Sequence, residues 1–197
     1  MSDQEKRQAI LQELAVAFWM EMETVINYIS NSINLDGVRA EEIKASLQAD
    51  VTAELMHAQL LAKRIKTLGG IVPGSASFVS RQTTLQPPKK LTDVASVIRG
   101  VIDAENSAID QYGKIIKLSE GFDYVTQDLC ITALGDEEEH RREFMGLPFG
   151  VRGLIGAVMN HEWTRIHTNS RRATEGPGLA DVWFSERTST HFSLSVS

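Results

Sequence analysis

Cysteine and long apolar runs are scarce in this chain, and each shortage excludes a class of protein. The single cysteine, Cys130, cannot form an intrachain disulfide, and its position in a helical apolar pattern fits a small buried hydrophobic residue. No apolar run approaches the roughly 18 residues of a membrane-spanning helix. The N-terminus is charged from Asp3 onward and shows no signal-peptide pattern. We therefore expect a cytoplasmic protein that does not span a membrane.

Basic side chains are also in short supply. The chain carries 20 Lys and Arg against 26 Asp and Glu, a formal net charge of −6 at pH 7. Residues 1–145 hold 22 acidic and 15 basic side chains, so this part alone has a net charge of −7. Such a surface repels phosphate backbones and anionic lipid headgroups. We expect neither nucleic acid nor a membrane as a partner.

Four segments show the apolar periodicity of long helices: 4–33, 41–68, 92–118 and 124–145, with Thr92 as the expected N-cap of the third. Two connections are short, which predicts antiparallel neighbours. The middle connection, 71–91, contains three of the five prolines and is long enough to travel the length of a bundle. The expected fold class is all-α, a four-helix bundle with one long crossover between helices 2 and 3.

Residues 147–197 differ from the predicted bundle of residues 1–146. A helix-like apolar face predicts a short fifth helix over 150–166. The Gly, Pro, Ser, Thr and Arg content from Ser170 onward is typical of a poorly ordered extension. The alternating end, 191–197, would instead fit a strand that docks on a partner. The role and partner of residues 168–197 stay open between these alternatives.

A four-residue phrase occurs twice, as Glu54-Leu-Met-His57 and Glu137-Glu-Glu-His140. Residues three apart in a helix lie about 60° apart around the axis and about 4.5 Å along it, so both side chains can reach one cation. Continuing the apolar stripe of each helix leads onto these residues. The phrase therefore predicts two metal-ligand pairs that face the core.

Two further apolar stripes each contain one carboxylate. Glu21 interrupts a stripe that runs from Leu14 to Tyr28, and Glu105 interrupts one from Val94 to Ile115. Buried ionised carboxylates without a counter-charge cost many kcal/mol or become neutral through raised pKa values. Glu21, Glu54, His57, Glu105, Glu137 and His140 are therefore the predicted metal ligands.

The positions of the turns give an independent test of this set. In an antiparallel hairpin, residues at equal height are centred on the turn. Glu21 and Glu54 centre on the Leu35-Asp36-Gly37 turn, and Glu105 and Glu137 centre on Gly121. Each pair should thus meet at one level of the bundle, about 24 Å from its turn.

Other polar residues near these stripes have less specific patterns. Glu23, Glu138, Glu139 and Glu143 are expected on a solvated face, although Glu23 could replace Glu21 if the helix register slips. Tyr28 and Tyr112 are expected to be core residues that hydrogen bond to ligands, with an electron-donor role as the alternative. Asp50 and Asp136 flank the site and are candidates for contacts to the ligands or for guiding metal inward. His167 follows His161 by six residues and so lies off its helical face, which argues against a metalloprotease motif.

Four carboxylates and two imidazoles form an oxygen and nitrogen donor set that suits iron or manganese, whereas structural zinc would favour thiolates. The four carboxylates carry −4, which balances two ferrous ions. The expected reaction is the two-electron oxidation of a di-ferrous pair.

The stretch Glu54-Leu-Met-His-Ala-Gln-Leu-Leu-Ala-Lys-Arg-Ile-Lys-Thr-Leu-Gly-Gly resembles the second helix of the ferritin-like superfamily, and of bacterioferritins in particular. The resemblance implies that Glu54 and Glu137 bridge two irons, that Glu21 and Glu105 are terminal ligands, and that His57 and His140 each bind one iron. It also implies a catalytic role for Tyr28. The haem-ligating methionine of that family corresponds to Leu55, so we expect no haem.

The resemblance implies a ferroxidase subunit for iron storage and detoxification, with two iron ions per subunit and O2 or hydrogen peroxide as oxidant. It also implies a homo-oligomer, a shell of 12 or 24 subunits. The alternative is a rubrerythrin-like di-iron or di-manganese peroxidase or oxidase that stores no mineral. A third hypothesis is a bundle that binds metal only for structure.

Overall fold

The computed structural model describes residues 2–146, which form four long α-helices, two short 3-10 helices and no β-strand. The elements are α1 (Asp3–Asn34), η1 (Val38–Ala40), α2 (Glu41–Thr67), η2 (Ser75–Ser77), α3 (Val94–Ser119) and α4 (Tyr124–Gly146). The predicted all-α four-helix bundle is confirmed. The expected fifth helix over 150–166 and the extension from residue 147 lie outside the described residues.

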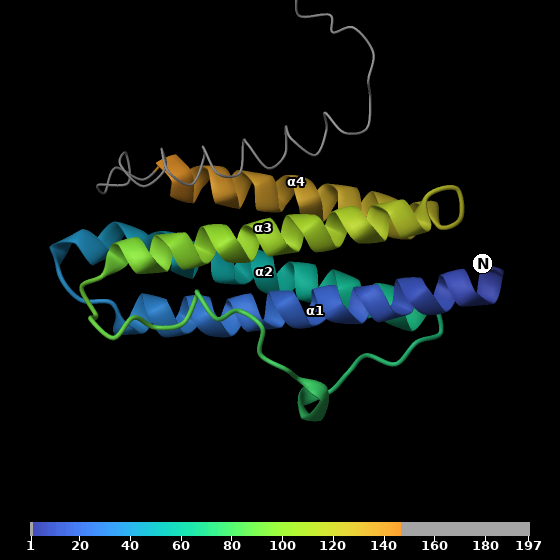
Figure 1. Cartoon of the computed structure of the whole chain (residues 1–197), viewed down its shortest axis with the longest axis horizontal. Helices are drawn as coiled ribbons and strands as arrows, with labels where there is room; N and C mark the ends of the chain where they lie inside the picture. Colours follow the sequence, from blue (N-terminus) through green and yellow to red (C-terminus); the bar gives the residue numbers. More distant parts are fainter. Residues whose placement is uncertain (1, 147–197) are drawn as a thin grey trace, which may run out of the picture. The chain divides into compact units, whose positions relative to one another are not determined.

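Two antiparallel hairpins make up the bundle (Figure 1). α1 packs against α2 and α3 against α4, while α1 also contacts α3 and α2 contacts α4. Gly37 and Gly121 occupy the two hairpin turns with φ of 95° and 66°, a region that side chains disfavour. Across residues 2–146, no helix combines the length and hydropathy of a membrane span.

Capping residues begin the helices where the sequence places suitable side chains. Ser2 Oγ accepts a hydrogen bond from the Glu5 backbone N–H, and Glu5 Oε2 accepts one from the Ser2 N–H, which forms a capping box. The N-cap of α3 is Asp93, not Thr92 as predicted. The Asp93 carboxylate accepts a hydrogen bond from the Ser96 N–H, the third helical amide, which fixes the start of the helix one residue later.

Residues 68–93, here called the strap, connect α2 to α3. In Figure 1 the strap leaves one end of the bundle and returns alongside α1 to the other end. Leu85 is buried at its centre, and the Asn31 side chain donates a hydrogen bond to the Leu85 carbonyl at 3.0 Å. Gly100 of α3 leaves room for the strap, because a Cβ there would lie 2.5 Å from the Thr84 carbonyl oxygen.

Glu23 corrects one expectation from the sequence. It was expected on a solvated face, but only 3% of it is exposed. Its carboxylate accepts hydrogen bonds from the Ser80 hydroxyl and from the backbone N–H groups of Arg81 and Gln82. Glu23 is therefore the residue of α1 that fixes the strap, because a buried carboxylate needs such donors in place of water.

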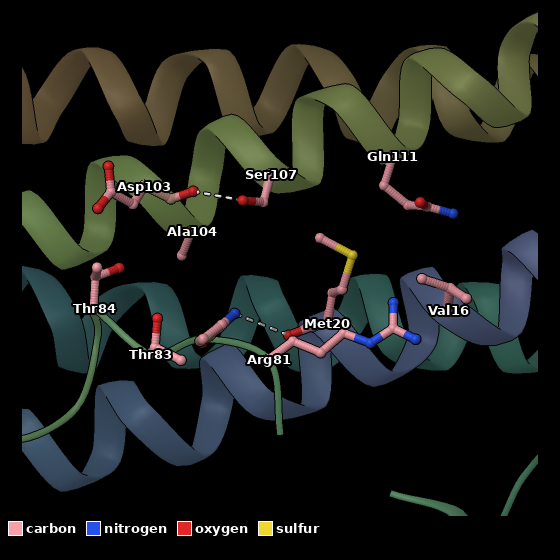
Figure 2. A pocket seen from close by; sticks show the side chains of 10 residues that line it. Val16, Met20, Arg81, Thr83, Thr84, Asp103, Ala104, Ser107 and Gln111 are labelled. Atoms are coloured by element: carbon pink, nitrogen blue, oxygen red, sulfur yellow. Dashed lines mark hydrogen bonds between the residues drawn. The ribbon is translucent and has the colours of Figure 1, made fainter. Parts of the chain in front are cut away.

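A groove of about 490 Å³ lies where the strap passes between α1 and α3 (Figure 2). Arg81 lies across it, and Ser107 on the α3 side donates a hydrogen bond to the Asp103 carbonyl. The groove is lined by Val16, Met20, Arg81, Gln82, Thr83, Thr84, Asp103, Ala104, Ser107 and Gln111. None of the six predicted metal ligands lines this groove.

The apolar core consists of two separate clusters. One cluster lies near the α1–α2 turn and includes Leu35, Ile43 and Ile98, and the other lies toward the opposite end and includes Leu14, Leu61 and Ile115. Every residue of the predicted α3 stripe is buried: Val94, Ile98, Val101, Glu105, Ala108, Tyr112 and Ile115. The polar members of the stripes lie between the two clusters.

Candidate metal centre

All six predicted ligands come together in the middle of the bundle. Each helix contributes to the set: α1 gives Glu21, α3 gives Glu105, and the other two helices give one Glu-x-x-His pair each. The four glutamates are at most 2% exposed and His57 is 3% exposed. The His140 side chain is 13% exposed.

The six residues form two groups of four, and Glu54 and Glu137 belong to both. Glu21 and His57 complete the first group, while Glu105 and His140 complete the second. Within each group, one ligand atom from every residue lies within 4.8 Å of the others. This arrangement can hold two cations side by side, with two carboxylates able to reach both.

Several buried ligand atoms face one another without making hydrogen bonds. His57 Nδ1 lies 3.0 Å from Glu137 Oε1, and neither atom has a hydrogen-bond partner among the described residues. Glu54 Oε1 is buried in the same way, 3.2 Å from His140 Nδ1. Buried polar atoms are rarely left without partners. A cation between these atoms would satisfy all of them.

Two tyrosines hydrogen bond to the two unshared carboxylates, Glu21 of the first donor group and Glu105 of the second. Tyr28 of α1 donates a hydrogen bond to Glu105 of α3, and Tyr112 of α3 donates one of 2.5 Å to Glu21 of α1. Both rings are fully buried. The expected hydrogen bonds between tyrosines and ligands are thus present, and they cross between the helices in both directions.

Asp136 lies beside His57, with Asp136 Oδ2 3.1 Å from His57 Nε2. Its side chain is 51% exposed, so it connects the buried ring to the surface. Asp50, the other flanking candidate, is half-buried on α2, and its Oδ2 atom is buried without a hydrogen-bond partner in the described part of the chain.

The crowding of carboxylates shifts their proton affinities. Burial raises the pKa of Glu21 to about 7, and the negative charge of Glu137 acts in the same direction. Burial and the Glu137 charge also raise the pKa values of Glu54 and Glu105 well above the usual range. The site therefore contains more negative charge than the bundle can hold without a cation.

Glu137 and His57 shift the opposite way and form an ion pair. Burial disfavours charge on both groups, but interactions with His140 and His57 outweigh it and lower the pKa of Glu137 to about 2. Interactions with Glu137 raise the pKa of His57 to about 9 against the effect of burial. In the absence of metal, the protonated imidazole supplies part of the positive charge that the carboxylates need.

The donor set fits the di-metal site that the sequence predicts. It contains four carboxylates and two imidazoles, and Cys130 lies in an apolar cluster with side chains of all four long helices. Hard and borderline cations such as Fe²⁺ and Mn²⁺ prefer such oxygen and nitrogen donors. The ligand roles of the individual residues stay a prediction.

The sequence did not specify the partners in two of the contacts around this centre. The reciprocal crossing of the tyrosine bonds was not foreseen, although Glu and Tyr are seven residues apart in both α1 and α3, at 21/28 and 105/112. The bond between Asp136 and His57 joins residues 79 apart in sequence, and no local pattern pairs them.

Comparisons with known proteins agree with this fold. The family model described as "Ferritin-like domain" matches residues 11–147. The chain is 24% identical over 154 residues to the bacterioferritin of Desulfovibrio desulfuricans, which covers 77% of this chain and 80% of that protein. It is 27% identical over 145 residues to the DNA protection during starvation protein of Pyrococcus furiosus, with 72% and 77% covered.

One similar solved structure is the dodecameric thioferritin of Bacteroides fragilis, a bacterioferritin-related protein. Its TM-score is 0.61 at 21% sequence identity, and the match covers 88% of this chain and 96% of that chain. At this identity the likeness concerns the fold.

Proposed function

This chain belongs to the ferritin-like domain family, and from that premise we propose that it binds two iron ions between its four helices and oxidises Fe²⁺ for iron storage or detoxification. The observation that carries the proposal is the pair of donor groups that share Glu54 and Glu137. The bundle of residues 1–146 performs this chemistry.

The residues divide into bridging and terminal ligands. Glu54 and Glu137 would reach both positions; Glu21 and His57 would complete the first position, and Glu105 and His140 the second. Four carboxylates balance the charge of two Fe²⁺ ions, which relieves the repulsion that raises the pKa values of Glu21, Glu54 and Glu105. Tyr28 and Tyr112 orient the terminal carboxylates through their hydrogen bonds.

Either O2 or hydrogen peroxide can accept the two electrons that a pair of Fe²⁺ ions releases. Two Fe²⁺ give two Fe³⁺ and two electrons, which reduce O2 with two protons to hydrogen peroxide, or reduce hydrogen peroxide with two protons to two waters. The shared ligands Glu54 and Glu137 would keep the two ions adjacent, so that both electrons could leave together. The catalytic role that we propose for Tyr28 is to hold the Glu105 carboxylate in position through its hydrogen bond.

We also propose that the chain assembles into a homo-oligomeric shell. The large apolar side chains Ile26, Ile29 and Ile33 on α1 and Met56 and Leu60 on α2 are exposed in the single chain, by 40–69%. Ile26, Ile29 and Ile33 follow helical spacing along one face of α1, and apolar surface of this kind often marks protein contacts. The Bacteroides fragilis relative in fold is described as dodecameric.

Iron oxidation by the purified full chain tests the proposed function. We expect two Fe²⁺ per chain to be oxidised rapidly by O2 or hydrogen peroxide, and the Glu54→Ala plus Glu137→Ala variant to lose that phase, because it lacks both shared ligands. Glu138→Ala plus Glu143→Ala is the matched control, since both glutamates are exposed. Unchanged oxidation in the Glu54/Glu137 variant would contradict the assignment.

Chromatographic mass separates storage from the alternative of a small peroxidase. A shell of 21.8 kDa chains elutes at hundreds of kilodaltons, whereas a dimer elutes at twice 21.8, about 44 kDa.

A further inference from the structure

The two hairpins repeat the same ligands at a nearly constant offset. Glu105 follows Glu21 by 84 residues and Tyr112 follows Tyr28 by 84, while Glu137 follows Glu54 and His140 follows His57 by 83. The two donor groups mirror this repeat, because each hairpin supplies three residues of its own group and one residue of the other. An exact repeat would make the two metal positions equal.

Asp136 breaks the equality. It lies 3.1 Å from His57 Nε2, and the position that corresponds to it in the first hairpin, 83 residues earlier, is Ala53. No side chain of residues 2–146 makes the equivalent hydrogen bond to His140 Nε2; the half-buried Asp50 carboxylate acts on His140 through its charge, without a hydrogen bond. His140 is also the more exposed of the two rings, at 13% against 3% for His57.

The contact with Asp136 defines how His57 can bind a metal. A carboxylate accepts hydrogen bonds, so the proton of the neutral imidazole resides on Nε2. The lone pair is then on Nδ1, which points at Glu137 Oε1 from 3.0 Å and has no hydrogen bond of its own. A carboxylate behind a ligating histidine fixes the ring and increases its donor strength.

We propose that Asp136 is a positioning residue that makes the two metal positions unequal. The position of Glu21 and His57 binds a divalent metal first and retains it. The position of Glu105 and His140 binds more weakly and exchanges its metal with solvent. This inference rests on the proposed di-metal function, and it assigns the turnover of substrate iron to the His140 position.

Calorimetric titration of the metal-free full chain with Co²⁺ tests the proposal without any catalytic turnover. We expect two binding steps of one equivalent each. A parallel titration followed by the visible absorption of Co²⁺ reports the ligand geometry of each step. Asp136→Ala should weaken the first step about 10–100-fold and leave the second unchanged. Asp136→Asn keeps an acceptor oxygen and should recover part of the loss.

Three further variants assign the steps to the two positions. His57→Ala should remove the tight step and His140→Ala the weak one, whereas Glu138→Ala, an exposed neighbour of the ligands on α4, should change neither. Three results would contradict the proposed inequality of the two positions but leave the di-metal function standing. They are two equal steps in the unmodified protein, a tight step that survives His57→Ala, and a tight step that is unchanged in Asp136→Ala. A chain that binds no Co²⁺ would contradict the proposed function as well.

Discussion

Tyr28 and Tyr112 connect the two halves of the metal centre through single side chains. Each phenol reaches across from its own helix to a carboxylate of the other hairpin. Burial, with the charge of the neighbouring carboxylate, raises the pKa of both phenols well above 10, so both remain hydrogen-bond donors at neutral pH. The orientation of Glu21 and Glu105 therefore depends on residues outside the ligand set.

Leu55 occupies the position where a haem-binding relative would have its methionine ligand. Leu55 offers no sulfur or nitrogen donor, and it and Met56 are 38% and 53% exposed on α2. We expect the purified protein to lack the Soret absorption of methionine-ligated haem, measured by visible spectroscopy after haem is added. A stoichiometric Soret band that disappears in Met56→Leu would show that the adjacent methionine replaces the missing ligand.

The strap is the element that differs most from a regular bundle. Its path along α1 is fixed by a few polar contacts, chiefly from Glu23 and Asn31, and by the burial of Leu85. Gly100 allows the strap backbone to approach α3 closely. Because the strap touches α1 and α3, it braces the two helices that carry Glu21 and Glu105.

Glu23→Ala should lower the free energy of unfolding by about 2–3 kcal/mol. The change removes the acceptor of two backbone N–H groups and one hydroxyl, in a place that water reaches poorly. Urea denaturation measures the loss, and hydrogen exchange should show faster exchange at Arg81 and Gln82. The exposed Glu138→Ala control should stay within about 0.5 kcal/mol. An equal loss of unfolding free energy in both variants would contradict the role of Glu23 in fixing the strap.

For the molecule as a whole, the metal centre divides the core. A layer of carboxylates and imidazoles separates the two apolar clusters, so part of the interior is electrostatically unfavourable until a cation binds. Stability and metal occupancy are therefore linked, and both depend on pH.

The metal-free protein should lose stability as pH rises from about 4.5 to 9. Glu21 has a folded pKa of about 7 and His57 of about 9, so the native state keeps protons that the unfolded chain releases. The loss from Glu21 falls between about pH 4.5 and 7 and is on the order of 3 kcal/mol. Glu137, with a pKa of about 2, acts only in acid, where its contribution is lost below about pH 4.5.

Thermal melts with and without Mn²⁺ at pH 5.5 and 8 measure this linkage. Metal requires deprotonated ligands, so it should raise the melting temperature more at pH 8. Glu21→Gln removes one titrating group and should flatten the pH dependence between 4.5 and 7. An equal metal effect at both pH values would mean that the clustered carboxylates are not the binding site.

Helical periodicity was sufficient to predict most of the bundle. It placed the α3 stripe correctly, and the two predicted turns are present, with Gly37 and Gly121 at positive φ. Contacts between distant segments could not be predicted. Glu23 has the local pattern of a solvated residue, and only the strap some 57 residues later buries it. The N-cap of α3 is Asp93 and not Thr92, because the Asp93 carboxylate is the one that accepts the Ser96 N–H. Both residue types can cap a helix, so the sequence alone does not decide between these neighbours.

The division of ligands between the hairpins has a consequence for folding kinetics. Each hairpin closes a short turn and can form early, since its contacts are local in sequence. Each donor group, however, takes one bridging glutamate from the opposite hairpin and is complete only after the hairpins dock. We therefore expect a bound cation to stabilise the native state more than a transition state in which the hairpins have not yet docked. Its effect should appear as a slower unfolding rate, with little change in the rate of folding.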